Sequence, residues 1–395
     1  MFCTETSNAL FFDDIEKISN EIWEELSLEN NYLKPPYLRS LQKNHLENRQ
    51  YYIIIKNKEK AVAIAMVQVI DFYIATLKSN YQNIASRIKK FGKKLQLLRD
   101  DKKLRILVCG NPYISGEYGI SLKQNEAKEQ IINRTIKAIT ELVDTKKELK
   151  KTVDVFLLKD FQKQSFSSTN TIKKYNYHPF SVEPNMVLKT RPHWITFQDY
   201  LADLKTKFRV KAKRALTLSE PLKVVKITTV NFAEHKEGIE HLYQSVAKNA
   251  SFNLTDFNIE TYKDFLVNFG KNYILQTYWL ADKMVGFISG FVQKEILDTH
   301  FVGIDYSYNK SHAIYQRLLY DYVNIGINQQ VKAINFGRTA SEIKSSIGAV
   351  PQELIMYMRH KKALPNTLLK LFLRSIGPTS FQQKKPFKKA LNKLS

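Results

Sequence analysis

The order of strand-like and helix-like segments in the second half of the chain most constrains the fold. Three apolar runs, YILQTYWL from Tyr273, MVGFISGFVQ from Met284 and ILDTHFVGID from Ile296, are separated by short polar turns. Such runs predict an antiparallel meander. The amphipathic segment Ser311–Ile327 then predicts a helix, and VKAINFG from Val331 predicts another strand. Because that strand must be reached by a crossover, the pattern predicts a mixed sheet of the α/β (α+β) class.

The first half shows a similar succession of elements. YYIIIK and the run AVAIAMVQVIDFYIATL from Ala61 predict a hairpin, RILVCG and VDVFLLKD predict strands, and residues 126–147 predict an amphipathic helix. The proline-bearing segment before Arg191 has little periodicity and marks a boundary near Lys189, after which Phe197–Ala215 predicts a very basic helix. We therefore expect one domain over residues 1–190, a second over 191–362 and a basic amphipathic tail over 363–395.

The net charge and the cysteine content indicate which partners and which cellular compartment to expect. The 61 Lys and Arg residues exceed the 38 Asp and Glu residues, so the net charge is +23. This excess predicts attraction to a polyanion, namely RNA, an anionic membrane surface, coenzyme A phosphates or an acidic carrier protein, or else a diffusely basic solvated surface. Cys3 and Cys109 are the only cysteines, and the eight histidines lack paired ligand spacing. We expect no disulfide framework, no metal site and a reducing cytoplasm.

The two ends of the chain bear on its location. The N-terminal MFCTETSNALFFDDIEK has acidic residues where a signal peptide needs basic ones, and the longest apolar run is interrupted by Gln68 and Asp71. From Lys361 to Ser395 there is no acidic residue, and leucines alternate with lysines and arginines. That composition predicts an interfacial helix on the inner membrane face, or else leucines that pack on the body of the protein. We expect a cytoplasmic, peripheral protein.

Three stretches carry a family resemblance: LKTKFRVKAKRAL from Leu204, GIDYSYNKSHAIYQRLLYDYV from Gly303 and INFGRTASEIKSSIGAVP from Ile334. Together they resemble the GNAT superfamily of acyltransferases in its tandem, Fem-like form. The resemblance implies two tandem mixed-sheet domains with flanking helices. It also implies no permanently bound cofactor, with acyl-CoA or an acyl-carrier protein as co-substrate.

The chain departs from that family at the phosphate loop. Many simple GNAT enzymes have a glycine-rich loop before the helix that follows strand four, whereas this chain has SYNKSHAIY with no glycine. Close backbone approach to a phosphate is therefore lost, and side chains must supply the donors. The donor-binding candidates are Asn309, Lys310 and Ser311, together with Arg209 and Lys213 of the basic segment, which otherwise forms a solvated face.

Acyl transfer to an amine needs a base, because an alkyl amine with a pKa of about 10.4 is mostly protonated at neutral pH. The candidates are His312, expected to begin a helix whose dipole keeps it neutral, His300 on the strand before it, and Glu342. A surface or capping histidine is the alternative for His312. Tyr306 is the candidate acid for the leaving thiolate.

The polar stretch after the strand INF supplies the substrate-binding candidates. Arg338 suits a phosphate or carboxylate, and we add Thr339, Ser341 and Lys344 from the same stretch. Asp305, after the preceding strand, is a further candidate. In the structural alternative, Thr339 or Ser341 caps the helix and Arg338 pairs with Glu342.

Three functions remain open. The first is an N-acyltransferase that joins an acyl group to the amine of a lipid precursor, such as a sphingoid-like or sulfonolipid-type base; some bacterial lipid N-acyltransferases have this architecture. The second is a Fem-type transferase that moves an amino acid from charged tRNA to a peptidoglycan precursor. The third is a non-catalytic protein that binds RNA or membranes. The leucine-rich basic tail favours the first.

Overall fold

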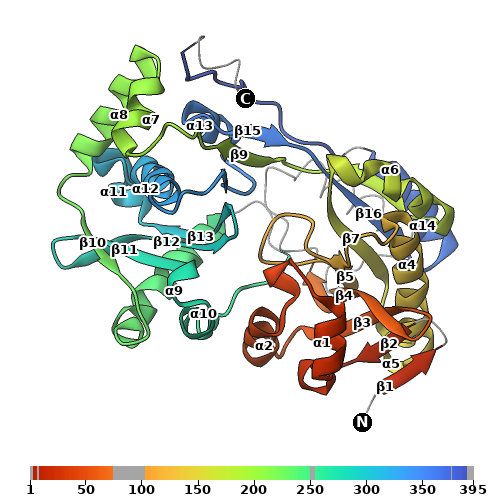
Figure 1. Ribbon diagram of the computed structural model, residues 1–395. Coiled ribbons are helices and arrows are strands. Elements are labelled where there is room, and N and C mark those ends of the chain that lie inside the picture. Colours follow the sequence, from red (N-terminus) through yellow and green to blue (C-terminus); the bar gives the residue numbers. More distant parts are fainter. Residues whose placement is uncertain (1–2, 7–8, 74–102, 250–253, 375, 389–395) are drawn as a thin grey trace. The chain divides into compact units, whose positions relative to one another are not determined.

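The structure is a computed structural model that describes residues 3–6, 9–73, 103–249, 254–374 and 376–388. The chain forms two compact units, and each is assembled from three segments (Figure 1). Unit 1 comprises Met1–Glu183, Ala250–Asn258 and Glu353–Pro378, and unit 2 comprises Pro184–Asn249, Ile259–Gln352 and Thr379–Ser395. The predicted ranges 1–190, 191–362 and 363–395 are contiguous, whereas the chain returns to each unit after leaving it. Residues 389–395 of the predicted tail lie outside the described part.

Unit 1 contains a mixed sheet of nine described strands in the order β1-β2-β3-β4-β5-β7-β16-β8, with β6 paired to β4. The strands are β1 (Cys3–Thr6), β2 (Ala9–Phe12), β3 (Arg49–Asn57), β4 (Lys60–Tyr73), β5 (Lys103–Cys109), β6 (Ile120–Leu122), β7 (Val155–Gln162), β8 (His178–Ser181) and β16 (Leu354–His360). β5 and β7 are parallel. β3 and β4 confirm the predicted hairpin, with Ile54 opposite Ile64.

Helices cover the sheet of unit 1. They are α1 (Asn20–Leu26), α2 (Pro35–Asn44), α4 (Lys128–Thr145), α5 (Lys147–Thr152), α6 (Phe166–Thr169) and α14 (Ala363–Leu373), with 3-10 turns η1 (Ile15–Lys17), η2 (Asn31–Leu33), η5 (Lys163–Ser165) and η6 (Asn170–Tyr175). The periodic isoleucines of α4, including Ile132 and Ile139, are buried in a core with Ile53 of β3. Leu373 of α14 belongs to a separate cluster with Val108 of β5. The predicted amphipathic helix over 126–147 is thus confirmed as α4.

Unit 2 contains a seven-stranded sheet in the order β10-β11-β12-β13-β14-β9-β15. The strands are β9 (Asn185–Lys189), β10 (Lys223–Lys226), β11 (Tyr273–Leu280), β12 (Lys283–Gln293), β13 (Ile296–Ile304), β14 (Ala333–Asn335) and β15 (Val350–Gln352). β10 to β13 are successively antiparallel, and β14 is parallel to β13. The meander and the mixed sheet are therefore confirmed.

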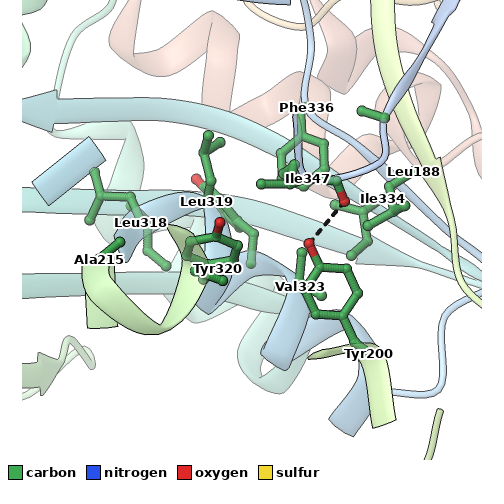
Figure 2. Packing of buried hydrophobic residues seen from close by; sticks show 14 of the residues in the cluster. Leu188, Tyr200, Ala215, Leu318, Leu319, Tyr320, Val323, Ile334, Phe336 and Ile347 are labelled. Carbon is green, nitrogen blue, oxygen red and sulfur yellow. Dashed lines mark hydrogen bonds between the residues drawn. The ribbon is translucent and has the colours of Figure 1, made fainter. Parts of the chain in front are cut away.

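The core of unit 2 lies between this sheet and its helices. These are α7 (Phe197–Asp203), α8 (Thr206–Leu218), α9 (Phe232–Asn249), α10 (Thr261–Phe269), α11 (Tyr306–His312), α12 (Ile314–Asn328) and α13 (Ser341–Ser346), with the 3-10 turn η7 (Gly270–Asn272). Figure 2 shows Leu318 and Val323 of α12 packed in the same cluster as Ile334 of β14. The hydroxyl of Tyr200 donates to the carbonyl of Ile347 at 2.9 Å and ties α7 to the end of α13 (Figure 2).

The single basic helix predicted over Phe197–Ala215 is wrong. The structure has two helices, α7 and α8, because the chain is extended at Leu204 and Lys205. The amide of Lys205 donates to the carbonyl of Pro386 at 2.8 Å, and Leu204 forms a β-bridge with Phe387. A backbone partner nearly two hundred residues away therefore replaces the helical hydrogen bonds at this point.

Candidate functional site

Two parallel strands diverge in unit 2. β13 and β14 pair only between Ile296–Asp298 and Ala333–Asn335, and β13 continues to Ile304 after β14 has ended. The side-chain amide Nδ2 of Asn335 donates to Asp298 Oδ1 at 2.9 Å, and both side chains are buried. From Thr299 onward β13 has lost its ladder partner on this edge. Backbone donors at such a divergence can polarise a carbonyl oxygen.

The loop after β14 has an unusual backbone. Gly337, Thr339 and Ala340 all have positive φ, at 64°, 66° and 49°. Thr339 is β-branched, and left-handed backbone is rare for such a residue, so the loop is held against its local preference. The amide of Gly337 donates to Asn335 Oδ1 at 3.0 Å, which anchors the loop to the buried pair.

Lys344 supports this loop through hydrogen bonds to its backbone. Its Nζ donates to the carbonyls of Phe336 at 2.7 Å and Arg338 at 2.6 Å, and its side chain is 4% exposed. Burial lowers the pKa of Lys344 to about 7, whereas the carbonyl oxygens around Nζ favour the ammonium form. The predicted substrate contact is therefore placed as an internal support, with its ammonium turned toward the loop carbonyls.

The polar groups on the loop have different environments. Arg338 is half-buried, Thr339 is exposed and Ser341 is buried. Within the described part of the chain, the hydroxyl of Ser341 has no hydrogen-bond partner. Glu342 is exposed and pairs with Lys384 at 2.8 Å, not with Arg338. Ala340 is the N-cap of α13 and makes no side-chain cap, so neither capping alternative forms.

His300 lies on the diverging part of β13. Its ring is half-buried and packs among aromatic rings, with centroids 6.0 Å from Tyr262, 6.2 Å from Phe265 and 5.8 Å from Phe291. The ring of Phe301 is closer, at 4.3 Å. His300 therefore lies within an aromatic cluster of unit 2.

Asp305 begins α11 as its N-cap. It accepts from the amide of Ser307 at 3.0 Å and pairs with Lys283 at 2.8 Å. Burial alone would raise the pKa of Asp305, but the hydrogen bonds from Lys283 and Ser307 lower it below its usual value. Tyr306 follows and is 48% exposed, and partial burial raises the pKa of its phenol. Tyr306 therefore stays protonated at neutral pH.

The donor-binding candidates after Tyr306 are partly engaged within the fold. Asn309 Oδ1 accepts from the amide of Tyr315 at 2.9 Å and so caps α12. Ser311 donates to the carbonyl of Tyr308 at 3.1 Å, and Lys310 is exposed. Lys310 is the charged member of these three candidates, and its side chain is exposed.

The expectation that His312 begins a helix is wrong. His312 is the last residue of α11, Ala313 is left-handed at φ 47°, and α12 starts at Ile314. His312 Nδ1 lies 2.9 Å from the hydroxyl of Ser311.

α8 presents the basic residues of the first family stretch. Its buried face consists of Ala212 and Ala215, Lys213 is exposed and Arg209 is half-buried. Arg317 of α12 donates to the carbonyl of Ser219 at 3.2 Å and fixes the end of α8. The helix that carries these basic side chains is therefore anchored to α12 at its C-terminal end.

Sequence reasoning missed a buried polar cluster in unit 1. Lys159 and Asp160 lie on β7, pair with each other and are 9% and 0% exposed. Asp160 has φ 66° at a register shift against β16, and it accepts from the amide of Gly116 at 3.2 Å. The pair KD inside the apolar strand VFLLKDFQ was a visible signal. Lys159 also donates to the carbonyl of Ile114, so both charged side chains bond to backbone groups of the loop that contains Ile114 and Gly116.

Two further findings concern the described residues only. The described residues contain no group of three or more His, Cys, Asp or Glu side chains placed to hold a metal ion. None of their helices is both long enough and apolar enough to cross a membrane.

Solved structures resemble most of the chain. A tandem GNAT protein from the clavulanic acid biosynthesis pathway has a TM-score of 0.53 at 9% identity, over 90% of this chain and 99% of that one. FemX has a TM-score of 0.51 at 8% identity, over 86% of this chain and 96% of that one. The chain has a tandem GNAT fold. This confirms the predicted fold class. No protein-family model and no curated protein matches the sequence.

Proposed function

We propose that the chain is an N-acyltransferase acting on a lipid amine at the cytoplasmic membrane face. It takes an acyl group from acyl-CoA or an acyl-carrier protein and forms an amide with a sphingoid-like or sulfonolipid-type base. The divergence of β13 from β14 beyond Asp298 and Asn335 carries the proposal, because it leaves backbone donors beside a loop of polar side chains. The similarity to the tandem GNAT structure supports acyl transfer.

Each candidate side chain has a role in this reaction. The acceptor ammonium loses a proton to Glu342, His300 or His312, and the neutral amine attacks the thioester carbonyl. The nitrogen of the adduct releases its second proton to solvent, the carbon–sulfur bond breaks, and Tyr306, still protonated, gives its proton to the leaving thiolate and regains one from solvent. Asp305, Arg338, Thr339, Ser341 and Lys344 line or support the acceptor side. Arg209, Lys213, Asn309, Lys310 and Ser311 serve the donor phosphates.

Glu342→Gln is expected to lower kcat/KM about 100-fold, because a carboxylate that accepts the amine proton cannot be replaced by an amide. The measurement is thiol release from an acyl-CoA with a long-chain amine. Glu295→Gln is the matched control, since Glu295 is also 58% exposed and paired with a lysine, Lys332. Lys384→Met removes the ion pair of Glu342 but keeps its carboxylate, and an equal loss there would make the role of Glu342 structural.

Charge reversal on α8 is expected to act on the donor alone. Arg209→Glu with Lys213→Glu raises the KM for the donor about tenfold at low salt and leaves kcat unchanged, because charges that solvent reaches attract phosphates over a distance set by ionic strength. Lys263→Glu, an exposed lysine on α10, is the control. A change in kcat, or no dependence on salt, would contradict this role.

Loss of the protein from its cell tests the substrate class. Deleting the gene should remove an N-acylated lipid and let its free-amine precursor accumulate, as seen by mass spectrometry. Unchanged lipids together with altered cell-wall peptides would favour the Fem-type alternative, for which the likeness of the fold to FemX is the supporting observation. Unchanged lipids and peptides would favour a non-catalytic protein.

A further inference from the structure

The helix α14 is fixed to unit 1. Leu373 is 2% exposed and packs in a cluster with Met356 of β16, and Leu369 and Phe372 pack against the same cluster. Asn366 joins the helix to its surroundings, since it accepts from the amide of His360 at 2.8 Å and donates to the carbonyl of Asn176 at 2.9 Å. Residues 363–373 therefore form a docked element beside β16, as Figure 1 shows, and not a free tail.

The opposite face of α14 is apolar and exposed. Leu364 is 66% exposed and Leu371 is 56% exposed, although both are large aliphatic residues. They are separated by two helical turns and share one side of the helix with half-buried Leu368. An aliphatic stripe on the outside of a helix whose inner face is already buried marks a surface for association.

Basic side chains surround this stripe. Lys361 and Lys362 precede the helix, Lys370 and Arg374 lie near its end, and all four are exposed. Lys361 donates to the carbonyl of Lys150, which brings the end of α5 beside the start of α14. Between Leu354 and Ser395 the sequence has no Asp or Glu.

The positive charge around α14 acts on a histidine of a neighbouring strand, and acidic residues lie near the start of the helix. Burial and, after it, the positive charge of Lys370 lower the pKa of His178 on β8. Two acidic residues lie near the start of α14: the carbonyl of Asp154 accepts from the amide of Lys361 at 2.8 Å, and Asp144 lies 3.5 Å from Lys150. The surface is thus strongly positive around an apolar centre.

We propose that the outer face of α14 docks on an anionic lipid bilayer, with Leu364 and Leu371 among the acyl chains and the surrounding basic residues at the headgroups. Charge complementarity selects this occupant, because an apolar stripe with a basic rim, on a helix that has no acid of its own, suits a negative membrane surface. The proposal concerns α14 alone, since residues 379–388 belong to unit 2. The proposal specifies the membrane partner of the proposed function, but it is measured without substrates.

Vesicle flotation with the full chain tests the docking face. We expect binding to vesicles of phosphatidylcholine and phosphatidylglycerol at 7:3, and at least tenfold weaker binding to phosphatidylcholine alone or in high salt. Leu364→Ser with Leu371→Ser should weaken binding to the anionic vesicles about tenfold. Val230→Ser with Val267→Ser is the matched control, since these exposed valines of unit 2, at 89% and 64%, lie on other elements.

A charge pair completes the test. Lys370→Gln with Arg374→Gln should weaken anionic binding, whereas Lys263→Gln with Lys271→Gln, exposed in unit 2, should leave it unchanged. The proposal is overturned if the wild type binds neither vesicle, if it binds both equally, or if the leucine variants, folded by circular dichroism, bind as the wild type does. Thiol release with a short water-soluble amine, measured without vesicles, reports separately on the transferase.

Discussion

Lys344→Met is expected to lower the free energy of unfolding by about 3 kcal/mol. Methionine fills the space of the aliphatic stem, but it leaves the carbonyls of Phe336 and Arg338 without their buried donor. Those carbonyls fix the left-handed backbone at Thr339 and Ala340, so the loop should also lose its single conformation. Urea unfolding measures the change, and transferase activity should fall with it.

The control for Lys344 is Lys332, whose ammonium is 75% exposed and pairs with Glu295. Lys332→Met should change the free energy of unfolding by less than about 0.5 kcal/mol, because exposed ion pairs contribute little. Equal effects at the two positions would show that burial of Lys344 has no special consequence for stability.

The pH course of the Lys344 effect has a defined sign. Burial lowers the pKa of Lys344 to about 7 in the folded chain, whereas an unfolded lysine has a pKa of about 10.4. Between these values the unfolded state holds a proton that the folded state has released, so the free energy of unfolding rises with pH. The wild type should therefore gain stability relative to Lys344→Met from about pH 7 to about pH 10, and a difference that falls over this range would contradict it.

The sheet of unit 2 was predictable because its information is local. The residues from Tyr273 to Ile304 form hairpins whose partners are a few residues away, so apolar runs and polar turns suffice to place them. The breaks at Lys205 and Ala313 were not predictable. Lys205 is held by Pro386, far along the chain, and Ala313 is left-handed although nothing in its residue type requires it.

The candidate site, like the sheet, was predictable from the sequence only in part. The run of polar residues after Phe336 pointed to the loop, because strands that break into such a run tend to end at a crevice. The sequence could not show that Lys344 turns inward, since a lysine on a short helix is ordinarily exposed. Nor could it show that Glu342 pairs with Lys384, because that contact depends on where the C-terminal segment lies.

Phe387→Ala is expected to lower the free energy of unfolding by about 3 kcal/mol, because the ring is 8% exposed and its removal leaves a cavity. The ring packs against Trp194, with centroids 5.6 Å apart, and beneath the guanidinium of Arg191 at 4.3 Å. It also lies against Gly348, where an added Cβ would come within 2.3 Å of it. Urea unfolding measures the loss, and Lys388→Ala, which keeps its backbone contact to Asp203, is the matched control with an exposed side chain.

The anchor at Phe387 also bears on the candidate site. The segment that ends in Phe387 carries Lys384, whose amide donates to the hydroxyl of Ser345 at 3.1 Å and whose ammonium pairs with Glu342. If Phe387 holds that segment in place, Phe387→Ala should remove the influence of Lys384 on Glu342. The effects of Phe387→Ala and Lys384→Met on kcat/KM would then be non-additive. Strict additivity would mean that Lys384 reaches Glu342 without the anchor, and that α13 alone positions the carboxylate.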